Sequence, residues 1–113
     1  MQIRKTYQEV NPELLYAEIR DFIQKQGAGL GEEKMETYAL PNDTSSFITL
    51  GTLTFSVQDA SGKEKECLRA HVVGSARTET KVMLDIDDKL FPPDKMSALQ
   101  EDLDFIFGAY EVK

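Results

Sequence analysis

The sequence of 113 residues is poor in the side chains that most often carry chemistry, with one cysteine, one histidine and no tryptophan. The lone Cys67 excludes a disulfide within the chain, and the N-terminal residues do not form an apolar stretch typical of a signal peptide. We therefore expect a cytoplasmic protein, because cysteines stay reduced in that compartment. No apolar run approaches the ~20 residues needed to cross a bilayer, so no membrane span is expected.

Basic residues are also in deficit. Twenty acidic and thirteen basic side chains give a net charge of -7. Such a surface repels nucleic-acid phosphates and anionic lipid headgroups, so we expect neither nucleic-acid binding nor membrane binding. The acids are concentrated between Asp85 and Asp104, where seven acids accompany two lysines. A basic partner could use this segment, although a charged, solvated face is the simpler interpretation.

The first part of the chain predicts a strand followed by a helix. Residues 2–10 alternate loosely between polar and apolar, which is typical of an edge strand. Asn11 is a favoured N-cap and Pro12 suits the first helical turn, while Gly27 ends the helix. Apolar residues recur between them with the spacing of a buried helical stripe, namely Leu15, Ile19, Phe22 and Ile23.

Polar and apolar residues then alternate over most of the next fifty residues, which indicates four further strands. The alternating segments are 34–40, 46–58, 63–74 and 77–87. Between the second and third of them, residues 59–62 read Asp-Ala-Ser-Gly, which is typical of a hairpin turn. The strands are therefore expected to pair as successive antiparallel neighbours.

The hairpin around residues 59–62 has one register that suits both faces of its strands, with Gln58 placed opposite Lys63. Leu53 then lies opposite Leu68 on the core face, and a slip of one residue would invert every side chain. The same register places two carboxylates, Glu64 and Glu66, on the core face. Paired carboxylates in a partly apolar site can act as acid and base. At the start of a strand, however, we expect both of them to be exposed.

The chain closes with a second amphipathic helix. Residues 91–93, Phe-Pro-Pro, stop the last strand, and Asp94 can cap the helix. Its apolar stripe consists of Met96, Leu99, Leu103, Ile106, Phe107 and Tyr110. We predict a single α+β domain over residues 1–113, of order β-α-β-β-β-β-α, with a twisted antiparallel sheet and two helices packed on one face. In this order of elements the chain resembles the TATA-binding-protein type of fold and a reduced helix-grip domain of the Bet v1 and START kind, and such a resemblance does not assign function.

Three short motifs suggest chemistry, and the context of each argues against it. Residues 27–31 look like a dinucleotide-binding loop, but such a loop follows a strand and opens a helix, whereas this segment follows a helix. Residues 85–88 hint at a calcium loop, but Leu90 stands where that loop requires Gly. Cys67 and His71 are four residues apart on one strand, so about 13 Å separates them, too far for proton transfer. We therefore expect no catalytic residue, no metal and no cofactor.

Two sets of residues on exposed faces are candidates for binding. Arg69 and His71 share the outer face of the predicted sheet and form a candidate anion site, although cross-strand charge pairing is the simpler interpretation. The other set is apolar and consists of Ile48, Leu50, Val73 and Met83 on the outer sheet face and Phe105 on the closing helix. Extra apolar surface of this kind often marks an interface, whereas single scattered hydrophobes are normal.

The leading hypothesis from the sequence is a non-enzymatic protein-interaction or assembly module, including a homodimer formed through the outer sheet face or the closing helix. The alternative is a helix-grip-type protein that holds a small apolar ligand between its sheet and helices. That alternative requires a cavity bounded by Phe22, Phe55, Leu84, Phe107 and Tyr110. The two hypotheses differ in whether the interior is packed or hollow.

Overall fold

The computed structural model describes residues 1–40, 43–75 and 78–112, and of residues 40 and 43–46 it describes the backbone. The elements follow in the order β1 (Gln2–Gln8), α1 (Pro12–Lys25), β2 (Gly29–Leu40), β3 (Asp43–Gln58), β4 (Glu64–Gly74), β5 (Glu79–Ile86) and α2 (Pro93–Phe107), with a final 3-10 turn at Gly108–Tyr110. The predicted order of strands and helices is confirmed.

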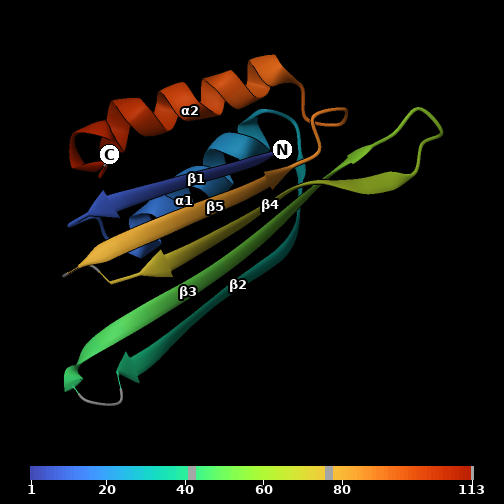
Figure 1. The fold of residues 1–113 in the computed structure, drawn as a ribbon. Helices are drawn as coiled ribbons and strands as arrows, with labels where there is room; N and C mark the ends of the chain where they lie inside the picture. The colour runs from blue at the N-terminus through green and yellow to red at the C-terminus, as the bar shows by residue number, and fades with distance from the viewer. Residues whose placement is uncertain (41–42, 76–77, 113) are drawn as a thin grey trace.

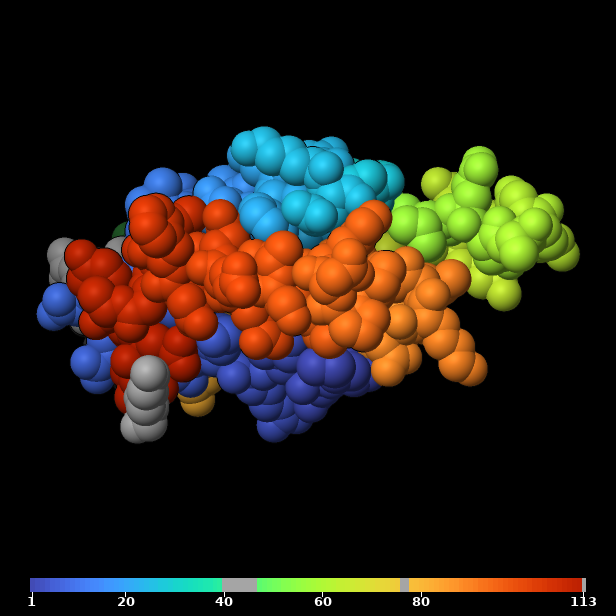
Figure 2. All heavy atoms as spheres, turned by 90° about the horizontal axis from the view of Figure 1, so that it is seen from above, coloured from blue at the N-terminus to red at the C-terminus, as the bar shows by residue number. Residues whose placement is uncertain are grey.

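All five strands form one antiparallel sheet in the order β1-β5-β4-β3-β2. Both helices lie on one face of this sheet and leave the other face open (Figure 1). Figure 2 views the helix side, where α1 and α2 lie next to one another and the β3–β4 turn projects beyond them. The predicted α+β architecture, with an antiparallel sheet and two helices on one face, is therefore confirmed.

The core lies between the sheet and the two helices. Leu15, Ile19 and Ile23 of α1 are fully buried, as are Leu99 and Leu103 of α2. They pack against the inward-facing strand residues, which include Leu53, Phe55, Ala70, Val72, Val82 and Leu84. Burying one such aliphatic side chain contributes about 1.5–3 kcal/mol, so this layer holds the helices on the sheet.

The two helices begin differently. The Asn11 side chain accepts a hydrogen bond from the Glu13 backbone N–H at 2.9 Å, as its position before Pro12 predicts. The expectation that Asp94 caps α2 is wrong, since the N-cap is Pro92 and no side chain bonds there. Asp94 instead lies in the first turn, where its charge still complements the helix dipole.

The predicted β3–β4 register is wrong because β4 contains a β-bulge at Cys67. Leu68 pairs with Phe55 and Glu66 pairs with Ser56, so Cys67 is an extra residue with no partner position on β3. Leu53 consequently lies opposite Ala70 instead of Leu68. The displacement there is two residues, an even number, so the core face of both strands is unchanged.

The bulge reverses the side chains that precede it on β4. Cys67 is turned into the core together with Leu68, and both are 1% exposed. Glu64 and Glu66 pair with Gln58 and Ser56, which puts them on the open face instead of the predicted core face. Both carboxylates are exposed, as expected, but for a different reason.

A second bulge bends β2 near its start. Residues 31 and 32 together lie opposite Thr54, whose side-chain oxygen accepts a hydrogen bond from the Glu32 backbone N–H at 2.6 Å. A Cβ atom on Gly31 would come within 2.7 Å of that oxygen, so glycine is required for this approach. The segment that looks like a nucleotide loop is therefore the entry to an edge strand.

The apolar stripe predicted for the second helix, α2, is buried over only part of its length. Met96, Leu99, Leu103 and Phe107 are buried, whereas Ile106 and Tyr110 are exposed. Tyr110 lies in the 3-10 turn that ends the helix, where the periodicity of the stripe changes. Across the described ranges, neither helix has the length and apolar character needed to span a membrane.

Candidate functional site

The open face of the sheet carries an apolar strip that crosses β2, β3 and β4. Tyr38 pairs with Ile48, and Leu50 pairs directly with Val73 on the neighbouring strand. Leu50 is 38% exposed, Val73 40% and Tyr38 49%, while Ile48 is half-buried. Side chains directly opposite one another on antiparallel strands are in contact range, so these residues form one continuous surface.

Next to the strip lies a surface depression of about 470 Å³, formed by β1, β4 and β5. The side chains of Val73 and Met83 supply its apolar lining, and Arg4, His71 and Lys81 supply polar groups. A smaller depression of about 290 Å³ shares Val73 and Lys81 and reaches Ile48. The strip and the two depressions together define the open-face site.

Among the described residues, two cations of the open-face site, Arg4 and Lys81, are outside ion pairs, whereas other cations on this face of the sheet are paired with carboxylates. Lys34 lies 2.7 Å from Glu36, and Arg69 lies 2.9 Å from Glu66, so both are neutralised locally. Within the described part of the chain, Arg4 and Lys81 have no carboxylate within ion-pair distance. Arg4 and Lys81 are therefore positive charges outside any ion pair that the described residues form at this site, in a protein of net charge -7, and the Glu79 carboxylate lines the smaller depression beside Lys81.

The two residues of the predicted anion site, Arg69 and His71, have different environments, because within the described ranges Arg69 is paired with a carboxylate and His71 is not. Arg69 and His71 do share the open face, as their cross-strand partners Thr54 and Thr52 show. The Arg69 guanidinium donates to the Glu66 carboxylate, and that bond raises the pKa of Arg69. His71 instead lies with Arg4 and Lys81 in the larger depression. Lys81 or Glu79 was the neighbour expected for Arg69 and His71 from the sequence, and Lys81 does line this depression. Arg4 was not predicted, although alternation along β1 places it on the same face.

The predicted interface residues fall on two separate surfaces. Ile48, Leu50, Val73 and Met83 belong to the open-face site. Phe105 is 91% exposed on α2, which covers the opposite face of the sheet. Tyr38 was also missed, although it lies two residues after Glu36 on β2 and therefore shares the open face with it.

The five residues proposed to bound a ligand cavity have different environments. Phe55 and Leu84 are fully buried in the core, and Phe22 is half-buried. Phe107 packs edge-to-face against Tyr7, with their ring centroids 6.0 Å apart. Tyr110 is half exposed at the end of α2. None of the five lines a depression described here, so the apolar-ligand hypothesis stays a prediction.

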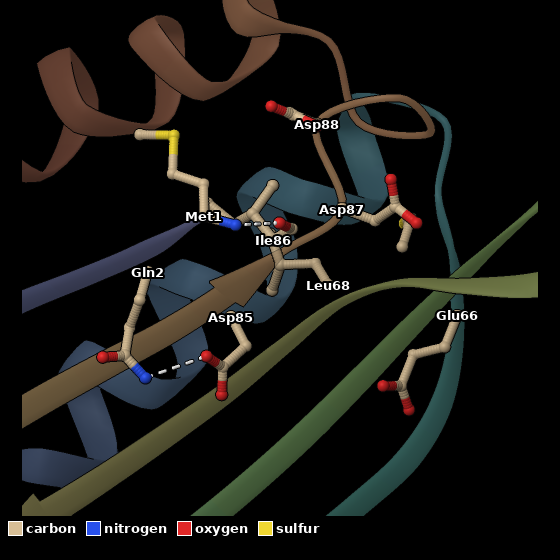
Figure 3. Close-up of a pocket in the computed structure, with 9 residues that line it drawn as sticks. Met1, Gln2, Glu66, Leu68, Asp85, Ile86, Asp87 and Asp88 are labelled. Atoms are coloured by element: carbon tan, nitrogen blue, oxygen red, sulfur yellow. Dashed lines mark hydrogen bonds between the residues drawn. The ribbon is translucent and has the colours of Figure 1, made fainter.

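A second depression of about 470 Å³ lies at the end of the sheet and is acidic (Figure 3). Its carboxylates are Glu66, Asp85, Asp87 and Asp88, which point in different directions. Gln2 donates to Asp85 at 3.0 Å, and the Lys89 backbone N–H donates to Asp87 at 3.0 Å. In the residues that the structure describes, no group of three acidic, histidine or cysteine side chains is arranged to hold a metal ion.

Cys67 also borders this acidic depression, but its thiol is buried. Burial raises the pKa of the Cys67 thiol, with smaller contributions from Asp87 and Glu66. The bulge turns Cys67 toward the core while His71 stays on the open face. The two residues are therefore on opposite faces of the sheet, and no thiolate–imidazole pair forms.

Comparison with models of known protein families, with curated protein sequences and with solved structures finds no match to this chain. The resemblance in element order to TATA-binding-protein and helix-grip folds therefore stays a prediction. Function has to be inferred from the surface of the protein itself.

Proposed function

We propose that this protein is a non-enzymatic interaction module whose open sheet face binds a segment of a partner protein. The observation that carries the proposal is the open-face site, where an apolar strip borders a depression with unpaired cations. Exposed apolar groups rimmed by polar ones are typical of protein interaction sites. The buried, unpaired thiol of Cys67 supports a cytoplasmic location for this module.

The chemistry of the site favours an acidic segment that also carries an apolar side chain. A partner carboxylate would meet Arg4 and Lys81 without displacing an existing ion pair. An apolar side chain of the same segment would cover Val73 and Met83, which form the floor of the depression. Complementary charge also selects against basic segments, since they would meet two cations.

The experiment is a titration with synthetic peptides, followed by NMR on the methyl groups of Val73 and Met83. One peptide contains aspartates around a phenylalanine, and the control peptide replaces each aspartate with lysine. We expect the acidic peptide to shift both methyl signals and the basic peptide to leave them in place. K81E should abolish the response to the acidic peptide, whereas K63E, at the tip of the β3–β4 hairpin, should preserve it.

Two outcomes would overturn the proposal. In one, neither peptide shifts the Val73 and Met83 methyls at millimolar concentration. In the other, the acidic peptide shifts them equally in wild type and K81E, which would show that the unpaired cations do not select the partner. Folding of each variant is checked by its amide spectrum, so that loss of binding is separated from loss of structure.

A further inference from the structure

The outer edge of β2 is free along the part of the chain that the structure describes. β2 ends the sheet on one side, since it pairs with β3 and with no other strand. Residues 31–35 and 37–39 are exposed, and Figure 1 shows no helix along this edge. A long free edge presents unpaired backbone N–H and C=O groups, which favour pairing with another strand.

We propose that a second copy of this chain pairs with β2 through its own β2, in antiparallel orientation about a two-fold axis. Self-association was expected at the open face or α2, and the structure points instead to this edge. The proposed dimer would extend each sheet into one sheet twice as wide. It uses the edge opposite β1. Only Tyr38 of the open-face site lies on this strand, whereas the depression with Arg4 and Lys81 is formed by β1, β4 and β5, so the dimer does not depend on the proposed function.

Symmetry limits the registers that this pairing can adopt. If the helices of both copies are to lie on the same side, the two-fold axis must be perpendicular to the sheet. Residues that lie opposite one another across the two strands must then point to the same face of the sheet. Because side chains alternate between the faces along each strand, this is possible only when one residue of β2 lies opposite the same residue of the second copy, with the axis between them. Each allowed register is therefore defined by one central residue of β2.

The charges on β2 select among these registers. With Met35 at the axis, Lys34 lies opposite Glu36 of the second copy, and Glu36 lies opposite the second copy's Lys34. Central positions at Glu33, Lys34 or Glu36 would each place that charged residue directly opposite itself. Like charges directly opposite one another are destabilising, whereas opposite charges stabilise. Registers centred on Thr37 or Tyr38 also avoid like-charge pairs, but among the registers centred on residues 33–38 only the Met35 register pairs opposite charges and has no like-charge pair.

The side chains that would meet at this axis are suitably placed. Lys34 and Glu36 pair with Thr52 and Leu50, which puts both charges on the open face. Their Nζ and Oε1 atoms are 2.7 Å apart within one copy, so in the dimer each charge would be shared between this ion pair and the pair across the axis.

On the helix side, Met35 is 38% exposed and would meet Met35 of the second copy. It borders a depression of about 410 Å³ between α1 and β2, which Tyr16 and Ala17 also line. Glu33 on this side is held by Arg20 at 2.9 Å and would face Thr37, an uncharged residue. The helix side therefore adds an apolar contact and no charge conflict.

Sedimentation velocity from about 1 to about 100 μM provides the test. Wild type should form a particle of twice the 12.8 kDa chain mass within this range. K34E and E36K should each weaken the dimer by at least about tenfold, because both cross-axis pairs become like-charged. An equimolar mixture of K34E and E36K should restore a 1:1 dimer, since each glutamate then faces a lysine. K63E and E64K, alone and mixed, are the matched controls and should dimerise like wild type.

The inference is overturned by a wild type that stays monomeric at the highest concentration, by single variants that dimerise like wild type, or by a mixture that fails to dimerise although both proteins are folded. The K81E variant separates this inference from the proposed function. If K81E loses peptide binding and still dimerises, the two surfaces are independent. If K81E becomes monomeric, the dimer is not formed by the β2 edge.

Discussion

Glu18 on α1 and Asp102 on α2 face each other through their carboxyl groups. The hydrogen bond to Asp102, followed by burial, raises the pKa of Glu18 from 4.5 to about 7. Asp102 Oδ2 is buried and has no hydrogen-bond partner in the described part of the chain, so it is available as an acceptor. Protonated Glu18 can donate to Asp102, and deprotonated Glu18 places two negative charges between the helices. Lys25 and Asp21, the nearby charges on α1, act on Glu18 in opposite directions.

Stability should therefore fall as the pH rises past this pair. The folded protein holds one proton more than the unfolded chain between about pH 4.5 and about pH 7. The stability that the protonated Glu18 adds to the folded protein is fully present below pH 4.5 and is lost as the pH rises through about 7. We expect E18Q to flatten this loss and to stabilise the protein at pH 8 by about 1 kcal/mol, because an amide can donate to Asp102 at any pH.

Urea unfolding between pH 5 and pH 8 measures this effect. E101Q is the control, since Glu101 is exposed on α2 and should leave the pH dependence as it is in wild type. If E18Q and wild type lose stability in parallel over this range, the two carboxyl groups do not share a proton.

The fold was largely predictable from the sequence because its signals are local. Asn11 and Pro12 mark the start of α1, and alternation assigns Leu53 to the core without knowledge of its partner. The register of β4 was not predictable in the same way, since it depends on a bulge. The adjacent apolar pair Cys67-Leu68 interrupts the alternation and was the available signal. Burying both side chains on one face is what the bulge achieves.

The candidate site was predictable only in part. Alternation places Leu50 and Val73 on the open face, and the structure adds that they are direct neighbours. Which cations are free depends on how side chains turn along each strand, which one sequence does not reveal. Arg69 is neutralised by Glu66 because the bulge turns Glu66 toward the same face. The free cations are therefore elsewhere, at Arg4 and Lys81.

Gly51 is predicted to be essential for the packing of α1 on β3. A Cβ atom at this position would lie 2.5 Å from Cδ2 of Tyr16, a buried α1 residue. Gly51→Ala should therefore destabilise the protein by about 1–3 kcal/mol, since an overpacked core must shift to accommodate the methyl group. Urea unfolding measures the loss. Gly108→Ala is the control, because its Cβ would have ordinary contacts at 3.8 Å in helical backbone, and an unchanged Gly51→Ala would refute the close packing.

Phe105 and Phe107 should respond very differently to the same substitution. Phe107 is 8% exposed and packs against Tyr7, so F107A should cost about 3 kcal/mol of stability. Phe105 is 91% exposed, so F105A should change the free energy of unfolding by less than about 0.5 kcal/mol. Urea unfolding of the two variants at one pH makes the comparison, and equal losses would contradict the orientation of α2.

Cys67 is predicted to be unreactive in the folded protein. Its side chain is buried by the bulge, and burial also raises the pKa of the thiol, so little thiolate is present or accessible at pH 8. A disulfide reagent such as Ellman's should label native protein slowly and label urea-unfolded protein at once. H71A should leave the native labelling rate unchanged, since His71 lies on the opposite face of the sheet. Rapid labelling of native protein that slows in H71A would instead require the thiol and imidazole to be neighbours, and would contradict the bulge that separates them.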